Sequence, residues 1–365
     1  MIERVILHKY KSIKNADIPL GRINLLIGGN GAGKSNFISV FDLLLATYNQ
    51  RLGEYVLRHG GANRMLYNGV KESGEVELIF DFDNVNAFRL RLQPSQESGK
   101  LFIAESGDYL NKDNDTTKDY AHAWHYRRWD SMAEESAILS SQTWHSGYLK
   151  KELKGVQVYH FHDTSRTAPM RGMCNINDND GLRPDGANLA ACLYKMQQTN
   201  PRNFMMLEGV VRSVAPYFKR FKLQPNALNP NEILMQWEAE ETDAYFDSYS
   251  FSDGTIRFIA LATLLMQDDK PSTIIVDEPE LGLHPFAIVK LAALVRRASV
   301  DSQIILASQS TNLINQFEPE NVIVVDRQDK QTVFKTLNSE DLAVWLENYS
   351  IGDIWEKNLI GGQPR

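Results

Sequence analysis

The first part of the chain changes from strand-like to helix-like spacing of its apolar residues. ERVILHKYKSI alternates apolar and polar positions, GRINLLIG is a short apolar run between glycines, and NFISVFDLLLATY repeats apolar residues with helical spacing. VELIFDF, AFRLRLQ and KLFIAE follow as three short β-rich runs separated by polar turns. This pattern predicts strands, a helix and then an antiparallel β meander.

The last third alternates strands with helices. FIALATLLMQ, FAIVKLAALVRRA and EDLAVWLENY have helical spacing, whereas STIIVDEPE, SQIILASQS and NVIVVD are short apolar runs. Strands that alternate with helices are typical of a parallel sheet covered on its faces. We therefore expect an α/β fold in which these strands join GRINLLIG in one sheet.

The middle of the chain has a weaker pattern. Residues 110–155 are polar and lack a sustained period, which indicates an irregular or helical insertion. GANLAACLYKMQQ and NFMMLEGVVRSVAPYF are predicted helices, and EILMQWEAEE is a predicted strand with its partner in YFDSYS. No heptad pattern persists, so we expect no long coiled coil.

Composition limits the domain organisation and the compartment. The 365 residues are 43% hydrophobic and 23% charged, as in globular proteins, and no apolar run approaches the ~20 residues that span a bilayer. The N-terminal residues lack the apolar segment of a secretion signal, so we expect a cytoplasmic protein with no membrane partner. We divide the chain into an N-terminal lobe over 1–109, a mainly helical insertion over 110–232 and a C-terminal lobe over 233–365.

The net charge argues against a protein that coats nucleic acid. It is −7, whereas domains of that kind carry a basic excess. Nucleic acid remains a candidate partner only through a local basic patch, and each patch can equally be a solvated face. The candidate patches are Arg127 and Arg128; Lys150, Lys151 and Lys154; and Lys219, Arg220 and Lys222.

The segment between GRINLLI and the first helix fits the phosphate-loop pattern G-x-x-x-x-G-K-[ST] completely. Its glycines allow backbone N–H groups to surround phosphates, and the following helix offers its positive N-terminus. Lys34 is placed to reach the β and γ phosphates, and Ser35 to hold Mg²⁺. The candidate nucleotide-binding residues are Gly28, Asn30, Gly31, Ala32, Gly33, Lys34, Ser35 and Asn36.

Two carboxylates follow the apolar strand STIIVD. Asp277 is placed to join the Mg²⁺ shell, and Glu278 to polarise the attacking water as a general base. An acidic pair after a strand can also be a solvated turn. The phosphate loop earlier in the chain favours the catalytic interpretation.

Two further segments carry candidate phosphate contacts. FSDGTIRF opens a helix with the small residues Ser252 and Gly254, and its exposed N–H groups suit an anion. Because one chain does not need two γ-phosphate sites of its own, this second site is predicted to serve another subunit's nucleotide. The alternative is a simple helix cap by Ser252. In SQIILASQS, Gln309 at the strand end is a candidate γ-phosphate sensor.

The order of these motifs resembles a known family. The phosphate loop, FSDGT, VDEPELGLHP and ASQST follow one another as in the ATP-binding-cassette heads of the SMC, Rad50 and RecF group, and EPELGLHP is similar to the OLD-like or "AAA_21" ATPases. VYHFHDTS, LRPDGANLAACLY and WLENYSIGDIWEKNLIGGQP resemble a bacterial group of single-head ATPases. The resemblance covers nearly the whole chain and is weakest over residues 110–155.

The resemblance implies a P-loop ABC-type ATPase head with a mixed sheet and an antiparallel β subdomain. Two heads of a homo-oligomer would hold ATP and Mg²⁺ between them, with Ser252 and Gly254 acting on the partner's nucleotide. Gly282 and His284 would lie in the D-loop at the contact between heads. The implied catalytic residues are Lys34, Glu278 and Gln309, and the implied metal ligands are Ser35 and Asp277.

Two positions depart from the family pattern. FSDGT stands where the common form is LSGGQ, and Gln309 stands where transporters have histidine. Because a neutral glutamine cannot become charged, the expected hydrolysis is slow or depends on assembly.

Two other polar clusters are weaker candidates for a functional site. His160, His162 and Asp163 could place two imidazoles on one face of a strand, but no further ligand follows at suitable spacing, so a structural role is favoured over a metal site. The run Asp178–Asp180 could be mistaken for a nuclease metal site. OLD-like nucleases carry a Toprim domain after the head, whereas about 50 residues follow Gln309 here, so we expect no nuclease activity in this chain.

Three functions suit such a head. The resemblance favours a sensor or assembly subunit that controls a separate effector, a nuclease or toxin, as in phage-defence systems such as PARIS and Septu. The alternative is a RecF-like clamp that binds DNA when ATP closes the dimer. A transporter motor fails on spacing, because about 220 residues separate Gly33 from Gly254, roughly twice the distance in transporter heads.

Overall fold

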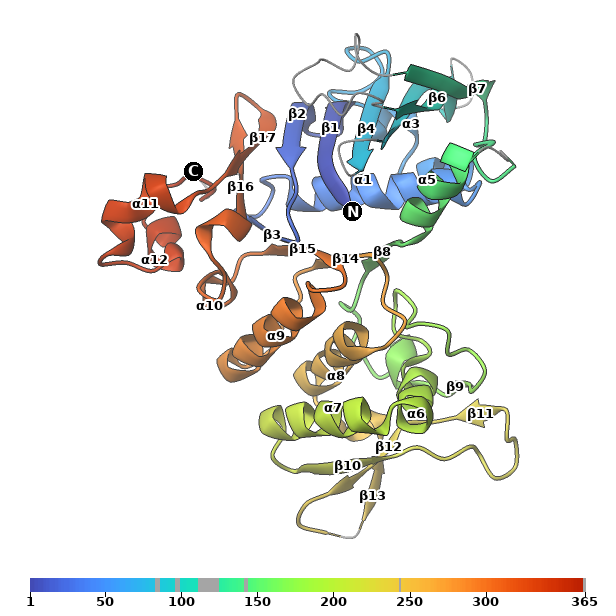
Figure 1. Cartoon of the computed structure of the whole chain (residues 1–365), viewed down its shortest axis with the longest axis vertical. Helices are drawn as coiled ribbons and strands as arrows, with labels where there is room; N and C mark the ends of the chain where they lie inside the picture. The colour runs from blue at the N-terminus through green and yellow to red at the C-terminus, as the bar shows by residue number, and fades with distance from the viewer. Residues whose placement is uncertain (83–85, 96–98, 111–124, 141–143, 243, 364–365) are drawn as a thin grey trace. The chain divides into compact units, whose positions relative to one another are not determined.

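The structure, a computed structural model, describes residues 1–82, 86–95, 99–110, 125–140, 144–242 and 244–363 (Figure 1). The chain forms two compact units. The first combines Met1–Gln157 with the segment that starts at Pro319, and the second is Val158–Glu318. The division made from the sequence at residues 109 and 232 stays a prediction. None of the helices in the described ranges is long and apolar enough to cross a membrane.

The first unit contains an antiparallel sheet with the strand order β2-β1-β4-β5-β6-β7. Its strands are β1 (Ile2–Tyr10), β2 (Ile13–Pro19), β4 (Val76–Phe82), β5 (Asn86–Pro94), β6 (Leu101–Leu110) and β7 (His125–Ala133). The pairing of β4 with β5 and of β5 with β6 confirms the predicted meander.

Helix α1 (Lys34–Tyr48) lies against this sheet (Figure 1). Aromatic side chains make the contact. The ring of Phe41 lies 5.9 Å from that of Phe80 on β4 and 5.4 Å from that of Phe37. All three rings are fully buried, so the helix that follows the phosphate loop is anchored by the unit's hydrophobic core. The shorter helices of this part are α2 (Leu52–Arg58), α3 (Ala62–Met65) and α5 (Trp144–Lys154).

Three strands from opposite ends of the chain form a second group in the first unit. β3 (Ile23–Ile27) pairs in parallel with β16 (Val322–Gln328), which pairs antiparallel with β17 (Gln331–Thr336). The pairing of NVIVVD with GRINLLIG confirms this part of the predicted sheet. The 3-10 turn η3 (Pro319–Asn321) precedes β16, and helices α11 (Ser339–Leu346) and α12 (Ile351–Glu356) follow β17.

The prediction of an irregular or helical insertion over 110–155 was wrong for β7, which is the edge strand of the antiparallel sheet. The strand carries a buried carboxylate, Asp130, which accepts hydrogen bonds from Ser106 Oγ, Ser136 Oγ and the Ala137 N–H at 2.5–3.1 Å. A satisfied polar side chain at an inward position breaks the hydrophobic alternation that identifies a strand. Residues 111–124 and 141–143 of the insertion lie outside the described ranges.

The second unit contains the predicted parallel pair. β14 (Thr273–Asp277) and β15 (Gln303–Ser308) pair in register, Thr273 opposite Gln303 and Asp277 opposite Ala307. The long helices of this part are α8 (Asp253–Met266) and α9 (Pro285–Ala298), with the short α10 (Thr311–Ile314) after β15. Because the two strands are parallel, their acidic and polar ends lie at one edge.

Helices α6 (Leu189–Thr199) and α7 (Pro201–Val214), which belong to the second unit, confirm the two helices predicted from the sequence, and β12 (Gln236–Ala239) pairs with β13 (Tyr245–Asp247). The basic run FKRFK is strand β10 (Phe218–Lys222), which pairs with β12 across a β-bulge. The bulge turns both Phe218 and Phe221 into the core although they are three residues apart. The remaining short elements are η1 (Pro169–Arg171), β9 (Cys174–Asn175), β11 (Glu232–Ile233) and η2 (Ser248–Ser250), and β8 (Val156–Tyr159) joins the two units along the chain.

Candidate nucleotide and hydrolysis site

The phosphate loop lies between β3 and α1, and its glycines have the conformation that such a loop requires. Gly31 has φ +77° and Gly33 has φ +117°, both in the left-handed region that favours glycine. Gly33 precedes α1, and neither a capping side chain nor an acidic residue lies on the first turn of that helix. The backbone N–H groups of the turn therefore suit the phosphates of a nucleotide.

Two glycines of the loop are enclosed by the β16–β17 hairpin. A Cβ at position 28 would lie 2.3 Å from the Val325 carbonyl oxygen, and a Cβ at position 33 would lie 2.2 Å from Thr332 Oγ1. Neither contact is tolerable, so both positions need glycine. The loop thus depends on residues that the chain supplies near its C-terminal end.

A relay of hydrogen bonds fixes the loop to its surroundings. Thr332 Oγ1, which is fully buried, donates to the Ala32 carbonyl oxygen at 2.8 Å and pairs with Ser12 Oγ at 2.7 Å. Asn36 Nδ2 in turn donates to Ser12 Oγ at 2.7 Å. Ser12 and Thr332 were not predicted from the sequence, since nothing in the local pattern connects either of them to the loop.

Lys34 is buried within the loop that it belongs to. Its Nζ donates to the carbonyl oxygens of Gly28 and Gly29, at 2.6 and 3.2 Å. The Gly29 N–H donates to the Gly362 carbonyl at 2.6 Å. An adjacent pocket of about 380 Å³ is lined by Gly29, Asn30, Gly31, Ala32, Asp326, Arg327, Lys330, Gly362 and Gln363. A cation and a cluster of backbone donors beside an open pocket fit a nucleoside triphosphate, with the Ser35 hydroxyl on the first turn of α1 as an oxygen ligand for Mg²⁺.

The acidic pair lies at the end of β14 in the second unit. Asp277 is the last residue of the strand, and Glu278 has φ +47°, a left-handed conformation that is uncommon for a side chain of this type. Its N–H donates to the Ala307 carbonyl at 2.8 Å. Gln309 Nε2 donates to Glu278 Oε1 at 3.0 Å. The candidate γ-phosphate sensor, Gln309, and the candidate base, Glu278, are therefore in direct contact. The left-handed backbone at Glu278 is a local strain of the kind that is typical of functional sites.

A third carboxylate, Glu280, belongs to this cluster and was missed from the sequence. Its Oε1 accepts hydrogen bonds from Ser308 Oγ at 2.5 Å and from the Gln309 N–H at 3.3 Å. Burial raises the pKa of Glu280, the Ser308 hydrogen bond opposes the shift, and the charge of Glu278 adds to it. Glu280 thus links the loop after β14 to Ser308 and Gln309 at the end of β15.

The candidate signature turn opens α8. Ser252 is the N-cap, and its Oγ accepts from the Thr255 N–H at 3.2 Å, so the cap proposed as the alternative does form. A Cβ at position 254 would lie 2.4 Å from the Gly282 carbonyl oxygen. Arg257 Nη1 donates to the Leu281 carbonyl. The turn and the loop that holds Gly282 are therefore in backbone contact, whereas the role of Ser252 and Gly254 in trans stays a prediction.

The remaining polar candidates have structural partners. His284 is the N-cap of α9, and its Nδ1 accepts from the Phe286 N–H at 3.2 Å. Asp163 accepts from the Ser165 N–H at 3.0 Å, and Asp178 pairs with Arg183 at 2.8 Å. Within the described ranges, no group of three or more His, Cys, Asp or Glu side chains is placed to hold a metal ion. Cys174 and Cys192 are free thiols, and burial raises the pKa of Cys192 to about 12.

A glycine-rich phosphate loop between β3 and α1, and carboxylates at the end of β14, define an ATPase of the ABC and SMC-head type. A family model described as "AAA domain, putative AbiEii toxin, Type IV TA system" (AAA_21) matches residues 23–315. The match covers most of the chain, and the chain belongs to this family.

Relatives outside the family model agree with this assignment. An OLD nuclease from Thermus scotoductus is 21% identical over 361 residues, which cover 91% of this chain and 64% of that protein. An SMC head bound to the C-winged helix domain of ScpA has a TM-score of 0.61 at 17% identity and covers 94% of this chain and 99% of that chain. An SMC head from Pyrococcus furiosus, bound to the C-terminal domain of ScpA, has a TM-score of 0.56 at 16% identity and covers 95% and 98%. These structures confirm the predicted fold of an SMC-type head.

The hydrogen bonds of the Thr332 hydroxyl indicate that the β16–β17 hairpin stabilises the phosphate loop. In Thr332→Val, the Ala32 carbonyl and the Ser12 hydroxyl lose a partner, so the free energy of unfolding should fall by about 1–3 kcal/mol. The affinity for ATP should fall with it. Denaturant titration and nucleotide binding measure the two effects. Thr332→Ser, which keeps the hydroxyl, is the control, and equal stability of the valine variant and the wild type would contradict the link.

The raised pKa of Glu280 predicts a pH-dependent stability. Between the ordinary carboxyl pKa of 4.5 and the raised pKa of the folded protein, the unfolded chain releases a proton that the fold retains. The stability contribution is therefore fully present below pH 4.5 and is lost as pH rises through this window. Glu280→Gln should remove the loss, so its free energy of unfolding should match that of the wild type near pH 4 and exceed it at pH 7. The effect would be excluded if the free energies of unfolding of the wild type and of Glu280→Gln, measured from pH 4 to 7, changed in parallel with pH.

Proposed function

We propose that this ATPase binds ATP between two copies of the chain, hydrolyses it slowly, and uses the assembled state to control a separate effector, a nuclease or toxin, in bacterial defence against phage. The observation that carries the ATPase part is the hydrogen bond from Gln309 to Glu278 at 3.0 Å, at the edge where β14 and β15 end. In this arrangement a base and a neutral amide lie side by side, and both groups can orient a water for attack on a γ-phosphate.

The chemical roles follow from the residue types. The backbone of Gly31–Ser35 and the Lys34 ammonium bind the β and γ phosphates, and Ser35 with Asp277 supplies oxygen ligands for Mg²⁺. Mg²⁺ held there would neutralise phosphate charge. Glu278 accepts a proton from the attacking water. At the same time the water oxygen bonds to the γ-phosphorus, and the bond between the γ-phosphorus and the oxygen of ADP breaks. Gln309 orients the Glu278 carboxylate and stays neutral, which supports slow turnover in the absence of a further stimulus.

Assembly in trans is supported by the turn Ser252–Gly254. It presents the N-terminus of α8, a helix of 14 residues, beside the loop of Gly282. The start of a helix attracts anions, and the phosphate loop already supplies one such site for a nucleotide. A second copy of the chain would bring its own γ-phosphate to this turn, so ATP would join two heads.

The effector and the defence role rest on the relatives. The description of the matched family names a toxin of a type IV toxin–antitoxin system, and the Thermus scotoductus relative is named a nuclease. A direct DNA clamp has less support, because the basic run on β10 is partly neutralised. Arg220 pairs with Glu238 at 2.5 Å, and Lys222 lies over the Tyr245 ring at 3.4 Å.

The test is co-expression with the product of the neighbouring gene. With ATP, the wild type should purify together with that protein, and the pair should protect cells from phage or kill them. Lys34→Ala, which weakens nucleotide binding, is the matched control and should release the partner. A chain that purifies alone, and that binds DNA tightly only with ATP and with a steep salt dependence, would support the clamp instead.

Replacement of the base separates binding from hydrolysis. Glu278→Gln should bind ATP as the wild type does and lose hydrolysis by about 10²-fold or more, because no group accepts the proton. ATP should therefore persist and hold the protein as a dimer or larger assembly, which light scattering measures. Undiminished turnover in this variant would remove Glu278 from the role of base.

A further inference from the structure

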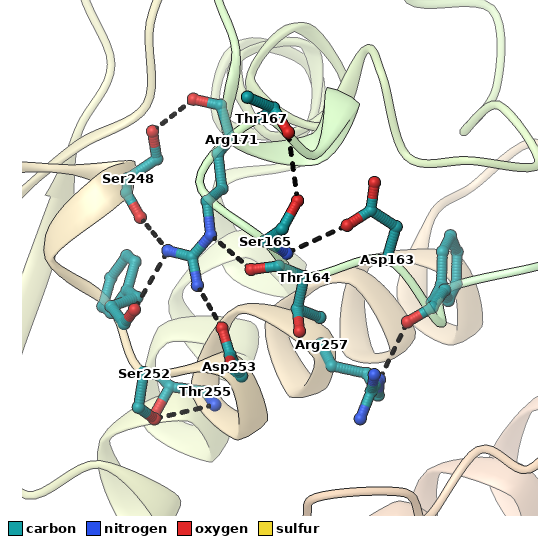
Figure 2. Close-up of polar contacts among 12 residues, drawn as sticks. Asp163, Thr164, Ser165, Thr167, Arg171, Ser248, Ser252, Asp253, Thr255 and Arg257 are labelled. Atoms are coloured by element: carbon teal, nitrogen blue, oxygen red, sulfur yellow. Dashed lines mark hydrogen bonds and ion pairs between the residues drawn. The ribbon is translucent and has the colours of Figure 1, made fainter.

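A buried arginine holds the turn that leads into α8. Arg171, on η1, is only 3% exposed, and its guanidinium makes four hydrogen bonds to the surrounding chain (Figure 2). It donates to the carbonyl oxygens of Thr164, Ser248 and Phe251 at 2.9, 2.7 and 2.9 Å, and to Asp253 Oδ1 at 2.9 Å. Two of these carbonyls and the carboxylate come from residues 248–253, which end at the signature turn.

The same segment is fixed by further contacts. Ser248 Oγ donates back to the Arg171 carbonyl at 2.5 Å. The Phe251 ring stacks on Trp237, with centroids 4.8 Å apart and an interplanar angle of 18°, and Trp237 stacks on Phe246 from β13 at 4.9 Å. Phe251 is buried and directly precedes Ser252. The backbone that enters α8 is thus held by an aromatic stack and a guanidinium.

A second arginine connects α8 to the loop after β14. Arg257 donates from Nε to the Phe161 carbonyl at 2.8 Å, from Nη2 to the His162 carbonyl at 2.9 Å, and from Nη1 to the Leu281 carbonyl. The segment from Phe161 to Arg171 therefore has two contacts with this region (Figure 2). Its carbonyl groups accept hydrogen bonds from Arg257 on α8, and its Arg171 side chain binds the turn that precedes α8.

We propose that Arg171 is a positioning residue that sets the Ser252–Gly254 turn for the nucleotide of the partner head. This inference rests on the proposed function. Only a planar guanidinium, with five donors in a fixed fork, can serve three carbonyls and a carboxylate at once. Burying this cation is costly unless its donors are satisfied, so the chain around it adopts one geometry. Asp253, which is 70% exposed at its side chain, balances the charge on the first turn of the helix.

A positioning role of this kind predicts a specific experimental result. Arg171 and the turn belong to the second unit, whereas the phosphate loop belongs to the first. Arg171 should therefore affect the contact that a head offers to another head, but not the affinity of that head for its own ATP. A merely structural arginine would change both in proportion to the loss of folded protein.

The test uses the full chain in the Glu278→Gln background, where ATP persists. Arg171→Gln should bind ATP within about two-fold of the parent, because the phosphate loop belongs to the other compact unit. Its ATP-dependent dimerisation should weaken about ten-fold or more, as loss of charge-assisted hydrogen bonds implies. Arg171→Lys, which keeps the charge but not the fork, should recover only part of the dimerisation.

The matched control is Asn188→Ala. Asn188 is also fully buried in the second unit, but its side chain bonds to residues 178–183, through the N–H of Arg183 and the carbonyls of Asp178 and Gly181. This variant should lose stability without a specific loss of dimerisation. If Arg171→Gln dimerises as tightly as its parent, or loses ATP affinity to the same extent as dimerisation, the positioning role is wrong.

Mixing two variants distinguishes action in trans from action in cis. Lys34→Ala has an intact signature turn, and Arg171→Gln has an intact phosphate loop. A dimer of the two variants therefore contains one site in which both the phosphate loop and the partner's signature turn are intact. The yield of this mixed dimer should equal that of wild type mixed with Lys34→Ala, and a lower yield would mean that Arg171 acts on its own head. Failure of the Glu278→Gln parent to dimerise with ATP would instead overturn the proposed function, and the inference with it.

Discussion

The Gly282 carbonyl oxygen lies 2.4 Å from where a Cβ at position 254 would stand, so the turn that opens α8 and the loop after β14 meet backbone to backbone. This close approach leaves no room for any residue but glycine at 254. Arg257 joins the same two segments through the Leu281 carbonyl. As a result, the loop that carries Glu278 and the Ser252–Gly254 turn form one block. The two segments are joined by direct contact rather than through a flexible connection.

The motifs of the site were predictable because each is written in consecutive residues. A glycine-rich loop between a strand and a helix has a local cause, and the left-handed glycines at 31 and 33 agree with it. Thr332 and Arg171 were not predictable in this way. Each acts on a segment distant in sequence, and a threonine on an edge strand or an arginine in a 3-10 turn has no pattern of its own. Their partners become visible only when the chain is folded.

The strands that escaped prediction have a common physical reason. β7 places a buried Asp130 at an inward position, and β10 contains a bulge that brings Phe218 and Phe221 to the same side. Both features interrupt the period of two that reveals a strand. The parallel pair β14 and β15, by contrast, has a continuous apolar run in each strand, and this run predicts the strands directly. The hydrophobic pattern therefore predicts the covered strands better than the strands with polar or irregular contacts.

The enclosure of the phosphate loop by the β16–β17 hairpin also orders events during synthesis. The loop at residues 28–35 leaves the ribosome well before Val325, Thr332 and Gly362, which contact it in the folded chain. A nascent or truncated chain would therefore carry the motif without its finished geometry. Nucleotide competence thereby requires translation at least through Gly362, and fragments that end before this residue are not expected to compete for ATP.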